Sequence, residues 1–115
     1  GLSAKVGSVT FTVTAKNACK ATFILCYGNK TSDGDRKFDT KYSLTVNGTA
    51  YTSNILFNLN TDSKTHYFGW EEYVVCTVDL VEGDNTFVLT SKGVTASNID
   101  YFKLESSDEL TFKKA

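Results

Sequence analysis

The sequence alternates apolar and polar residues with a period of two over most of its length. In "SVTFTVT", residues 8–14, Val9, Phe11 and Val13 are separated by threonines. Successive side chains of a β-strand point to opposite faces, so this pattern predicts half-buried strands. No segment shows a convincing helical period of 3.6 residues. Seven or eight short strands are therefore expected, over residues 8–14, 19–27, 42–46, the return arm that follows, 73–80, 85–91, 98–105 and 109–113.

The dipeptide Asn47-Gly48 predicts a hairpin after the strand at 42–46. Asparagine and glycine supply the two positive φ values that a type I′ turn needs. Asn47 also opens a glycosylation sequon, but we interpret it as a turn residue. The return arm is expected to carry apolar residues at alternate positions, which are Ile55, Phe57 and Leu59.

Residues 81–84, "VEGD", predict a second hairpin. This polar segment contains a glycine and joins the strands expected at 73–80 and 85–91, as short turns between paired strands do.

The length of 115 residues is that of one domain with a core of its own, so we treat residues 1–115 as a single domain. An all-β chain of this size predicts a two-sheet antiparallel β-sandwich of the jelly-roll type. The chain starts at Gly1 and contains no methionine. We expect it to be a segment cut from a longer protein.

Composition excludes several classes of partner. Hydrophobic residues make up 41% and charged residues 22% of the chain, as in ordinary globular proteins. The net charge of −1 provides no electrostatic surface for nucleic acid or for an anionic membrane. No apolar run approaches the roughly 18 residues of a transmembrane span.

The three cysteines, Cys19, Cys26 and Cys76, lack the C-x-x-C spacing of a metal site. We expect buried or half-buried thiols within strands, and one disulfide with a third, unpaired thiol is the alternative.

Catalytic groups are scarce. The single histidine, His66, has no nucleophile with which to build a triad. Glu71 and Glu72 are neighbours, so on a strand they point to opposite faces and cannot act as a matched acid and base. We expect no enzyme activity, and a small hydrolase that uses these residues is the least favoured alternative.

Two long connections, residues 28–40 and 60–72, are candidate binding loops. The first is polar and charged. The second gathers Tyr67, Phe68 and Trp70 around a glycine. Trp70 taken alone fits a core position or a ligand platform, whereas Tyr67 lies outside the alternating pattern and is expected to be exposed. An aromatic ring fits the apolar C–H face of a pyranose, and an amide such as that of Asn98 both donates to and accepts from sugar hydroxyls.

The order of several short motifs resembles carbohydrate-binding modules of families 6 and 35, a galactose-binding-domain-like β-sandwich. The resemblance covers roughly residues 8–105, and each motif alone is weak. The matching positions are Cys26-Tyr27-Gly28-Asn29 for the family's Arg-Tyr-Ala-Asn, Val46-Asn47-Gly48 for its hairpin, Trp70 before a valine-rich strand, Leu80, Gly83 and Asn85 for Leu-x-x-Gly-x-Asn, and Asn98-Ile99-Asp100 for the Asn-Ile-Asp that opens the last strand.

The resemblance implies a jelly-roll sandwich that binds glycans at its loop end without catalysis. Position by position, Asn98 falls on the asparagine at the floor of the family's cleft, and Tyr67 and Trp70 fall on its loop aromatics. Asp100 falls on a ligand of the family's structural calcium. The Glu-x-Glu strand that completes that calcium site is absent here, and the C-terminal "ELTFK" is a candidate for its edge-strand place. No cofactor is certain, and calcium stays open.

The leading hypothesis from the sequence is a non-catalytic carbohydrate-binding module for a plant or other polysaccharide or oligosaccharide. We expect it to be secreted or on the cell surface, bacterial, and covalently linked to catalytic or surface domains in the full-length protein. The alternative is a structural or adhesive β-sandwich whose aromatics pack against a neighbouring domain.

Overall fold

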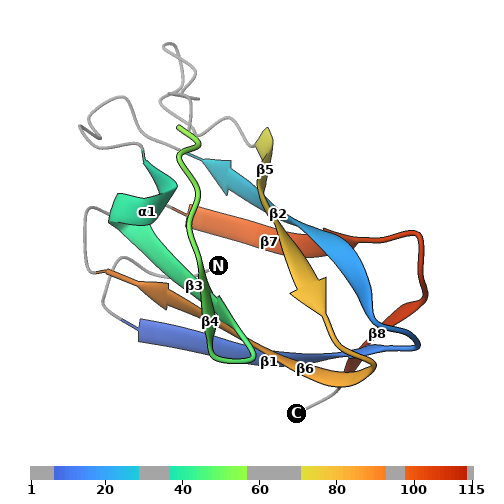
Figure 1. Cartoon of the computed structure of the whole chain (residues 1–115). Coiled ribbons are helices and arrows are strands. Elements are labelled where there is room, and N and C mark those ends of the chain that lie inside the picture. Colours follow the sequence, from blue (N-terminus) through green and yellow to red (C-terminus); the bar gives the residue numbers. More distant parts are fainter. Residues whose placement is uncertain (1–6, 29–36, 57–70, 93–97, 114–115) are drawn as a thin grey trace.

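The computed structural model describes residues 7–28, 37–56, 71–92 and 98–113, which form two antiparallel sheets packed face to face (Figure 1). The strands are β1 (Gly7–Ala15), β2 (Cys19–Gly28), β3 (Tyr42–Val46), β4 (Thr49–Tyr51), β5 (Glu71–Leu80), β6 (Gly83–Ser91), β7 (Asn98–Glu105) and β8 (Leu110–Lys113), with one short helix, α1 (Phe38–Lys41). The five-stranded sheet has the order β4-β3-β6-β1-β8 and the three-stranded sheet β5-β2-β7. The all-β, two-sheet sandwich predicted from the sequence is confirmed.

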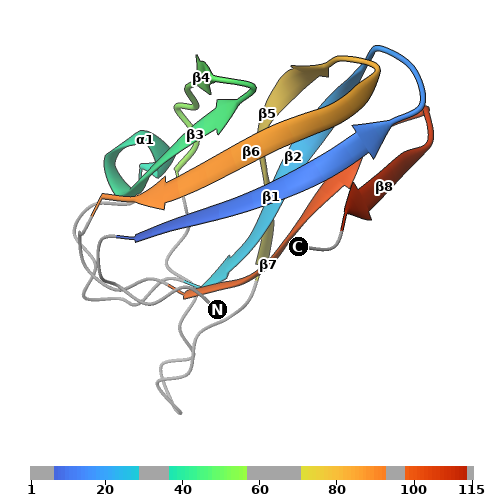
Figure 2. The ribbon, with the colours of Figure 1, turned by 90° about the horizontal axis from the view of Figure 1, so that it is seen from below.

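Consecutive strands alternate between the two sheets, except for β3 and β4. In Figure 2 the long strands β6 and β1 run across β5, β2 and β7 of the other layer. This alternation explains the period of two in the sequence, because each strand buries one face against the opposite sheet and exposes the other. Apart from the β3–β4 hairpin, neighbouring strands in each layer come from segments that are not consecutive in the chain.

The prediction of a hairpin at residues 81–84 is wrong. β5 pairs with β2 in the three-stranded sheet, whereas β6 lies between β3 and β1 in the five-stranded sheet. The chain instead crosses between the layers, with Gly83 at a φ of +93°. The physical reason is burial: Val78 of β5 and Phe87 of β6 are both fully buried in one core, so their strands face each other across it.

Aromatic rings close the space between the sheets. Phe11 of β1 stacks on Phe102 of β7 with ring centroids 4.3 Å apart, and on Phe87 with centroids 4.8 Å apart. Phe23 of β2 joins the same group, 6.4 Å from Phe87. Offset stacking of this kind adds about 0.5–1.5 kcal/mol per pair beyond the burial of area. The buried apolar residues of the core are Val13, Ala15, Ala21, Phe23, Leu25, Phe38, Tyr42, Leu44, Val46, Tyr73, Val75, Val78, Leu80, Phe87 and Leu89.

The Asn47-Gly48 hairpin is confirmed, with φ values of +52° and +82°. Its return arm is shorter than predicted, because β4 ends at Tyr51. Beyond it the chain turns towards α1, where the backbone N–H of Ser53 donates to both oxygens of Asp39 at 2.8 and 3.0 Å. Ile55 is half-buried outside any strand, and Phe57 and Leu59 lie outside the described residues.

Helix α1 was not anticipated in the polar connection 28–40. It is a single turn whose first residue, Phe38, is fully buried, with its ring 5.9 Å from that of Tyr42. The backbone N–H of Phe38 donates to the carbonyl of Ile55 at 3.2 Å. A four-residue helix leaves no 3.6-residue pattern, so packing fixes this turn and periodicity cannot reveal it.

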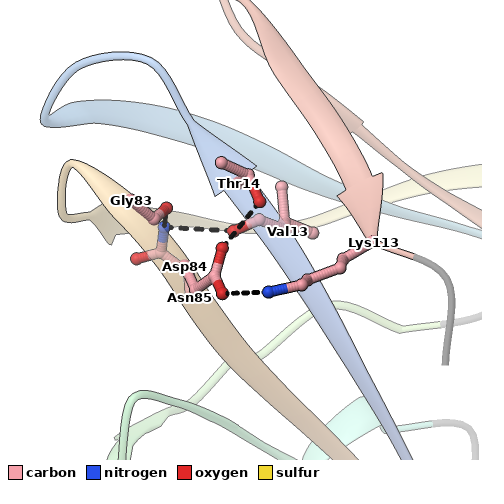
Figure 3. Close-up of polar contacts among 6 residues, drawn as sticks. All are labelled: Val13, Thr14, Gly83, Asp84, Asn85 and Lys113. Atoms are coloured by element: carbon pink, nitrogen blue, oxygen red, sulfur yellow. Dashed lines mark hydrogen bonds and ion pairs between the residues drawn. The ribbon is translucent and has the colours of Figure 1, made fainter.

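The side chain of Asn85 is fully buried and joins three parts of the fold. Figure 3 shows it beside Val13 and Gly83. Its Oδ1 accepts from the backbone N–H of Val81 at 2.8 Å. Its Nδ2 donates to the carbonyls of Val81 and Gly83, both at 3.0 Å, and to that of Val13 on β1 at 3.3 Å. The amide therefore closes the crossing turn and fixes that turn to the neighbouring strand.

Asn85 also holds the hairpin turn at Asn47. The Asn47 Nδ2 donates to Asn85 Oδ1 at 2.8 Å, and the Asn47 Oδ1 accepts from the backbone N–H of Thr86 at 2.9 Å. Both ends of the Asn47 amide are thus used inside the fold, in agreement with its interpretation as a turn residue. Two of the short motifs behind the sequence resemblance, Val46-Asn47-Gly48 and Leu80-x-x-Gly83-x-Asn85, are in direct contact.

All three cysteines carry thiols in strands, as expected. Cys19 and Cys76 are half-buried and Cys26 is buried. Burial raises the pKa of the Cys76 thiol to about 11, and the charge of Asp39 adds to the shift, so this thiol stays protonated at neutral pH.

Replacing Asn85 by alanine should destabilise the fold strongly. Asn85→Ala leaves the buried Val13 carbonyl and the part-buried Val81 N–H without their side-chain partner, and we expect the free energy of unfolding to fall by about 2–4 kcal/mol. Urea denaturation followed by circular dichroism measures this. Asp84→Asn is the matched control, because Asp84 is exposed beside Asn85 and the bonds described for its carboxylate are those to Thr14 and Lys113. Equal losses for the two variants would contradict the central place given to Asn85.

Candidate functional site

Three strand ends meet at one end of the three-stranded sheet, which we call the loop end. β2 ends at Gly28, β5 begins at Glu71 and β7 begins at Asn98. In the register Tyr27 lies opposite Glu71, and Gly28 lies opposite Asn98. The backbone of Asn98 is therefore where the sequence predicted it, at the loop-facing start of the last long strand.

The predicted site residues are only partly described by the structure. Tyr67 and Trp70 lie outside the described residues. Asn98 and Asp100 are described in their backbone, and their side chains are not. The assignment of Tyr67, Trp70 and Asn98 to a ligand, and of Asp100 to a metal, therefore stays a prediction.

The register of β7 shifts at Asp100. Cys26 and Tyr27 are neighbours on β2, yet their partners on β7 are Tyr101 and Ile99. Asp100 lies between those partners and has no residue opposite it, as in a β-bulge. Bulges bend a strand and change the direction of its side chains, and they are common next to functional sites. An asparagine and an aspartate near a strand start are thus compatible with a strand that is irregular at this point.

Metal ligands do not gather within the part of the chain that the structure describes, where no three His, Cys, Asp or Glu side chains lie close enough to hold an ion. Asp100 is the one residue that the sequence resemblance offers for calcium.

A polar cluster on the outer face of the three-stranded sheet was not anticipated from the sequence. It consists of Glu72 on β5 with Tyr101 and Lys103 on β7, and we call it the sheet-face cluster. The Tyr101 hydroxyl donates to Glu72 Oε2, and Lys103 Nζ lies 3.1 Å from Glu72 Oε1. Lys103 Nζ is also 3.9 Å from a carboxylate oxygen of Glu105. Both oxygens of Glu72 are thus held by side chains from one other strand.

These contacts set the protonation states of the cluster. The hydrogen bond from Tyr101, followed by that from Lys103, holds the pKa of Glu72 below its usual value. The same bond to Glu72 raises the pKa of Tyr101 well above its usual value, and Glu72 also raises the pKa of Lys103. At neutral pH the cluster is a carboxylate, a neutral phenol and an ammonium group. A carboxyl group held ionised is a poor general acid, so the cluster suits binding better than catalysis.

Part of the signal for this cluster is visible in the sequence. In the last long strand Tyr101, Lys103 and Glu105 alternate with Phe102 and Leu104, so their outward orientation follows from periodicity. The contacts of Tyr101 and Lys103 with Glu72 cannot be predicted from periodicity, because they depend on β5 and β7 lying on the two sides of β2.

The single helix in the described segments has four residues, too few to cross a membrane.

No protein-family model matches the sequence, and no curated protein matches it. Solved structures do match. A family 35 carbohydrate-binding module from an environmental isolate is similar over 100% of this chain and 77% of its own, with a TM-score of 0.72 and 18% identity. A family 35 module from Clostridium thermocellum is 25% identical over 90% of this chain and 72% of its own, with a TM-score of 0.65.

A third match is a family 35 module solved in complex with a disaccharide that contains glucuronic acid. It covers 97% of this chain and 75% of its own, with a TM-score of 0.69 and 20% identity. The resemblance stated from the sequence motifs is confirmed at the level of the fold.

The sheet-face cluster predicts a specific change in the titration of Tyr101. In Glu72→Gln the phenol no longer donates to an anion, so its pKa should fall towards the ordinary value of about 10. NMR of the Tyr101 ring carbon across an alkaline pH series measures this. Glu105→Gln is the matched control, since Glu105 reaches Lys103 and makes no described contact with Tyr101. An unchanged Tyr101 pKa in Glu72→Gln would contradict the described bond.

Two carboxylates should make the fold sensitive to acid. The pKa of Glu72 is lowered mainly by Tyr101, and that of Asp84 is lowered mainly by Lys113. A carboxyl group with a lowered folded-state pKa stabilises the fold above its unfolded pKa, about 4, and this contribution disappears as the pH falls through the folded value. The melting temperature should therefore fall below pH 4, and less so in the double variant Glu72→Gln, Asp84→Asn. Parallel curves for the parent and the double variant would refute this cause.

Proposed function

We propose that the chain is a non-catalytic carbohydrate-binding module that binds a polysaccharide or an oligosaccharide. The observation that carries the proposal is the match of the whole fold to family 35 modules, one of which was solved with a disaccharide. The order of the sequence motifs also supports the proposal. Two of these motifs, those at Asn47 and Asn85, are in contact in the folded chain.

The loop end is the proposed binding site. Asn98 begins β7 opposite the last residue of β2, and Trp70 directly precedes the first residue of β5 in the sequence. The rings of Tyr67 and Trp70 would stack on a pyranose, while the amide of Asn98 would hydrogen-bond its hydroxyls. Binding there must desolvate many sugar hydroxyls, so modest affinity is expected.

The setting of the module is part of the proposal. A binding module without catalysis acts by holding a partner near its substrate, so we propose that this chain is linked to catalytic or surface domains in a secreted or cell-surface bacterial protein. The expected gain is in local concentration at the polysaccharide, and no new contact between the domains is needed.

The test is a glycan array on the isolated module, followed by titration of the hits with Asn98→Ala. Loss of one amide that holds sugar hydroxyls should weaken binding by about tenfold. Asn17→Ala is the matched control, because Asn17 is an exposed asparagine between β1 and β2, at the other end of β2 from Gly28. Equal binding by Asn98→Ala and the parent would show that the proposed site is wrong.

The single tryptophan gives a second, independent measurement. Stacking of Trp70 on a sugar should shift its fluorescence on addition of a hit from the array, and Tyr67→Ala should weaken the same titration. If no glycan binds and Trp70 fluorescence changes only in a longer protein, the structural or adhesive sandwich is the correct alternative.

A further inference from the structure

The hairpin turn between β3 and β4 places an asparagine directly before a glycine, a pair in which the asparagine is open to attack by the backbone. Asn47-Gly48 is the one Asn-Gly pair in the chain. Glycine has no side chain, so its backbone nitrogen can approach the side-chain carbon of the preceding residue. Both residues are exposed in the structure. The turn therefore combines the reactive pair with access to water.

The reaction that this pair can undergo is deamidation, which needs no reagent other than water. The Gly48 backbone nitrogen loses its proton to solvent base and attacks Asn47 Cγ, which forms an N–Cγ bond and a five-membered imide. The Cγ–Nδ2 bond breaks, and the side-chain nitrogen takes up a proton and leaves as ammonia. Water then opens the imide at either carbonyl and gives aspartate or isoaspartate. The net change is the gain of a water and the loss of an ammonia, with no oxidation.

In the folded protein the Asn47 amide is held on β6. Its Nδ2 donates to Asn85 Oδ1 at 2.8 Å, and its Oδ1 accepts from the backbone N–H of Thr86 at 2.9 Å. The backbone N–H of Asn47 also donates to the Thr86 carbonyl at 2.8 Å. Both the side chain and the backbone of Asn47 are thus fixed to β6. Turning the side chain towards the Gly48 nitrogen has to break both bonds of the amide.

We propose that Asn47 is a site of spontaneous deamidation, and that the rate of the reaction is set by the opening of its bonds to Asn85 and Thr86. The closed turn is protected, whereas the open turn reacts as an Asn-Gly pair does in an unfolded chain. Exposed parts of a protein open locally at a smaller free-energy cost than the whole fold. The reaction therefore proceeds in the folded protein, at a rate lowered by the fraction of time that the turn is closed.

The product cannot restore the contact that Asn47 makes. A carboxylate at this position has no hydrogen to donate to Asn85 Oδ1, so two acceptors face each other. Isoaspartate also adds a methylene group to the backbone of the turn, which disturbs the pairing of Val46 with Thr49. The hairpin then loses its bond to the crossing turn between β5 and β6. Deamidation is thus expected to weaken the fold irreversibly.

Mass spectrometry of the tryptic peptide 42–64 tests the site. The parent protein is incubated at mildly alkaline pH, folded in buffer and unfolded in guanidinium chloride. We expect Asn47 to react about tenfold faster or more in the unfolded chain. Asn54 is the internal control, because it is exposed in the same peptide and precedes isoleucine, so it should react far more slowly. Gly48→Ala in guanidinium chloride should slow the reaction of Asn47 several-fold, because a methyl group then hinders the attacking nitrogen.

Hydrogen exchange tests the role of the two bonds. The Thr86 N–H donates to Asn47 Oδ1, so its exchange, followed by ¹⁵N NMR, reports the opening of this contact. Over a temperature series the deamidation rate of the folded parent, divided by that of the unfolded chain, should change in proportion to the open fraction at Thr86. Asn85→Ala removes the acceptor of the Nδ2 bond, and should raise the Asn47 rate in the folded protein by about threefold to tenfold.

The variant Asn47→Asp reproduces the charge of the product and tests its effect on the fold. We expect it to unfold at a lower urea concentration than the parent. Asn54→Asp is the matched control, since it adds the same charge at an exposed position after β4 and should leave the midpoint unchanged.

Three results would each overturn a part of the proposal. An unreactive Asn47 in the unfolded chain would exclude the site. Equal Asn47 rates in the folded and unfolded parent, or a folded rate that does not follow the exchange of Thr86, would exclude control by the two bonds. Equal urea midpoints for Asn47→Asp and Asn54→Asp would exclude the loss of stability.

Discussion

The arrangement of the two sheets depends on one buried amide. Asn85 uses both atoms of its side-chain amide, accepting from Val81 and Asn47 and donating to three backbone carbonyls. A buried polar group is tolerable only when its hydrogen bonds are made, and here the bonds serve three structural tasks. One closes the crossing from β5 to β6, one fixes that crossing to β1, and one holds the hairpin between β3 and β4. The loop end and the sheet-face cluster are positioned by strands whose order this residue helps to fix.

Much of the fold could be predicted from local pattern, and its connections could not. Alternation identified every long strand, and Asn47-Gly48 identified its turn, because both signals are carried by neighbouring residues. The segment at 81–84 has the composition of a hairpin turn, but the strands on its two sides belong to different sheets. Val78 and Phe87 are buried in the same core from opposite layers, and this burial decides the pairing. Helix α1 escaped detection because a single turn is held by Phe38 in the core and by no repeating pattern.

At the loop end and in the sheet-face cluster, too, local features could be predicted from the sequence and contacts between strands could not. Motif order placed Asn98 at the start of the last long strand, and the structure puts its backbone opposite Gly28 there. The bulge at Asp100 could not be foreseen, because it is a property of the pairing of two strands. The contact between Tyr101 and Glu72 joins residues 29 positions apart across a third strand. Outward-facing tyrosines are visible in a sequence, whereas their partners across a sheet become visible only with the strand order.

The alternation of strands between the sheets has a consequence for how the chain folds. Only β3 and β4 pair with a strand that is next to them in the sequence. β1 pairs with β6 and β8, which begin more than sixty residues after β1 ends. Each such pairing must first overcome the entropy of closing a long loop, so folding should be slow and limited by topology. A nascent chain that stops before β6 would expose both edges of β1 and would lack Phe87 and Phe102, the rings that stack on Phe11. Kinetics, more than final stability, would then limit how well such a module tolerates truncation or insertion.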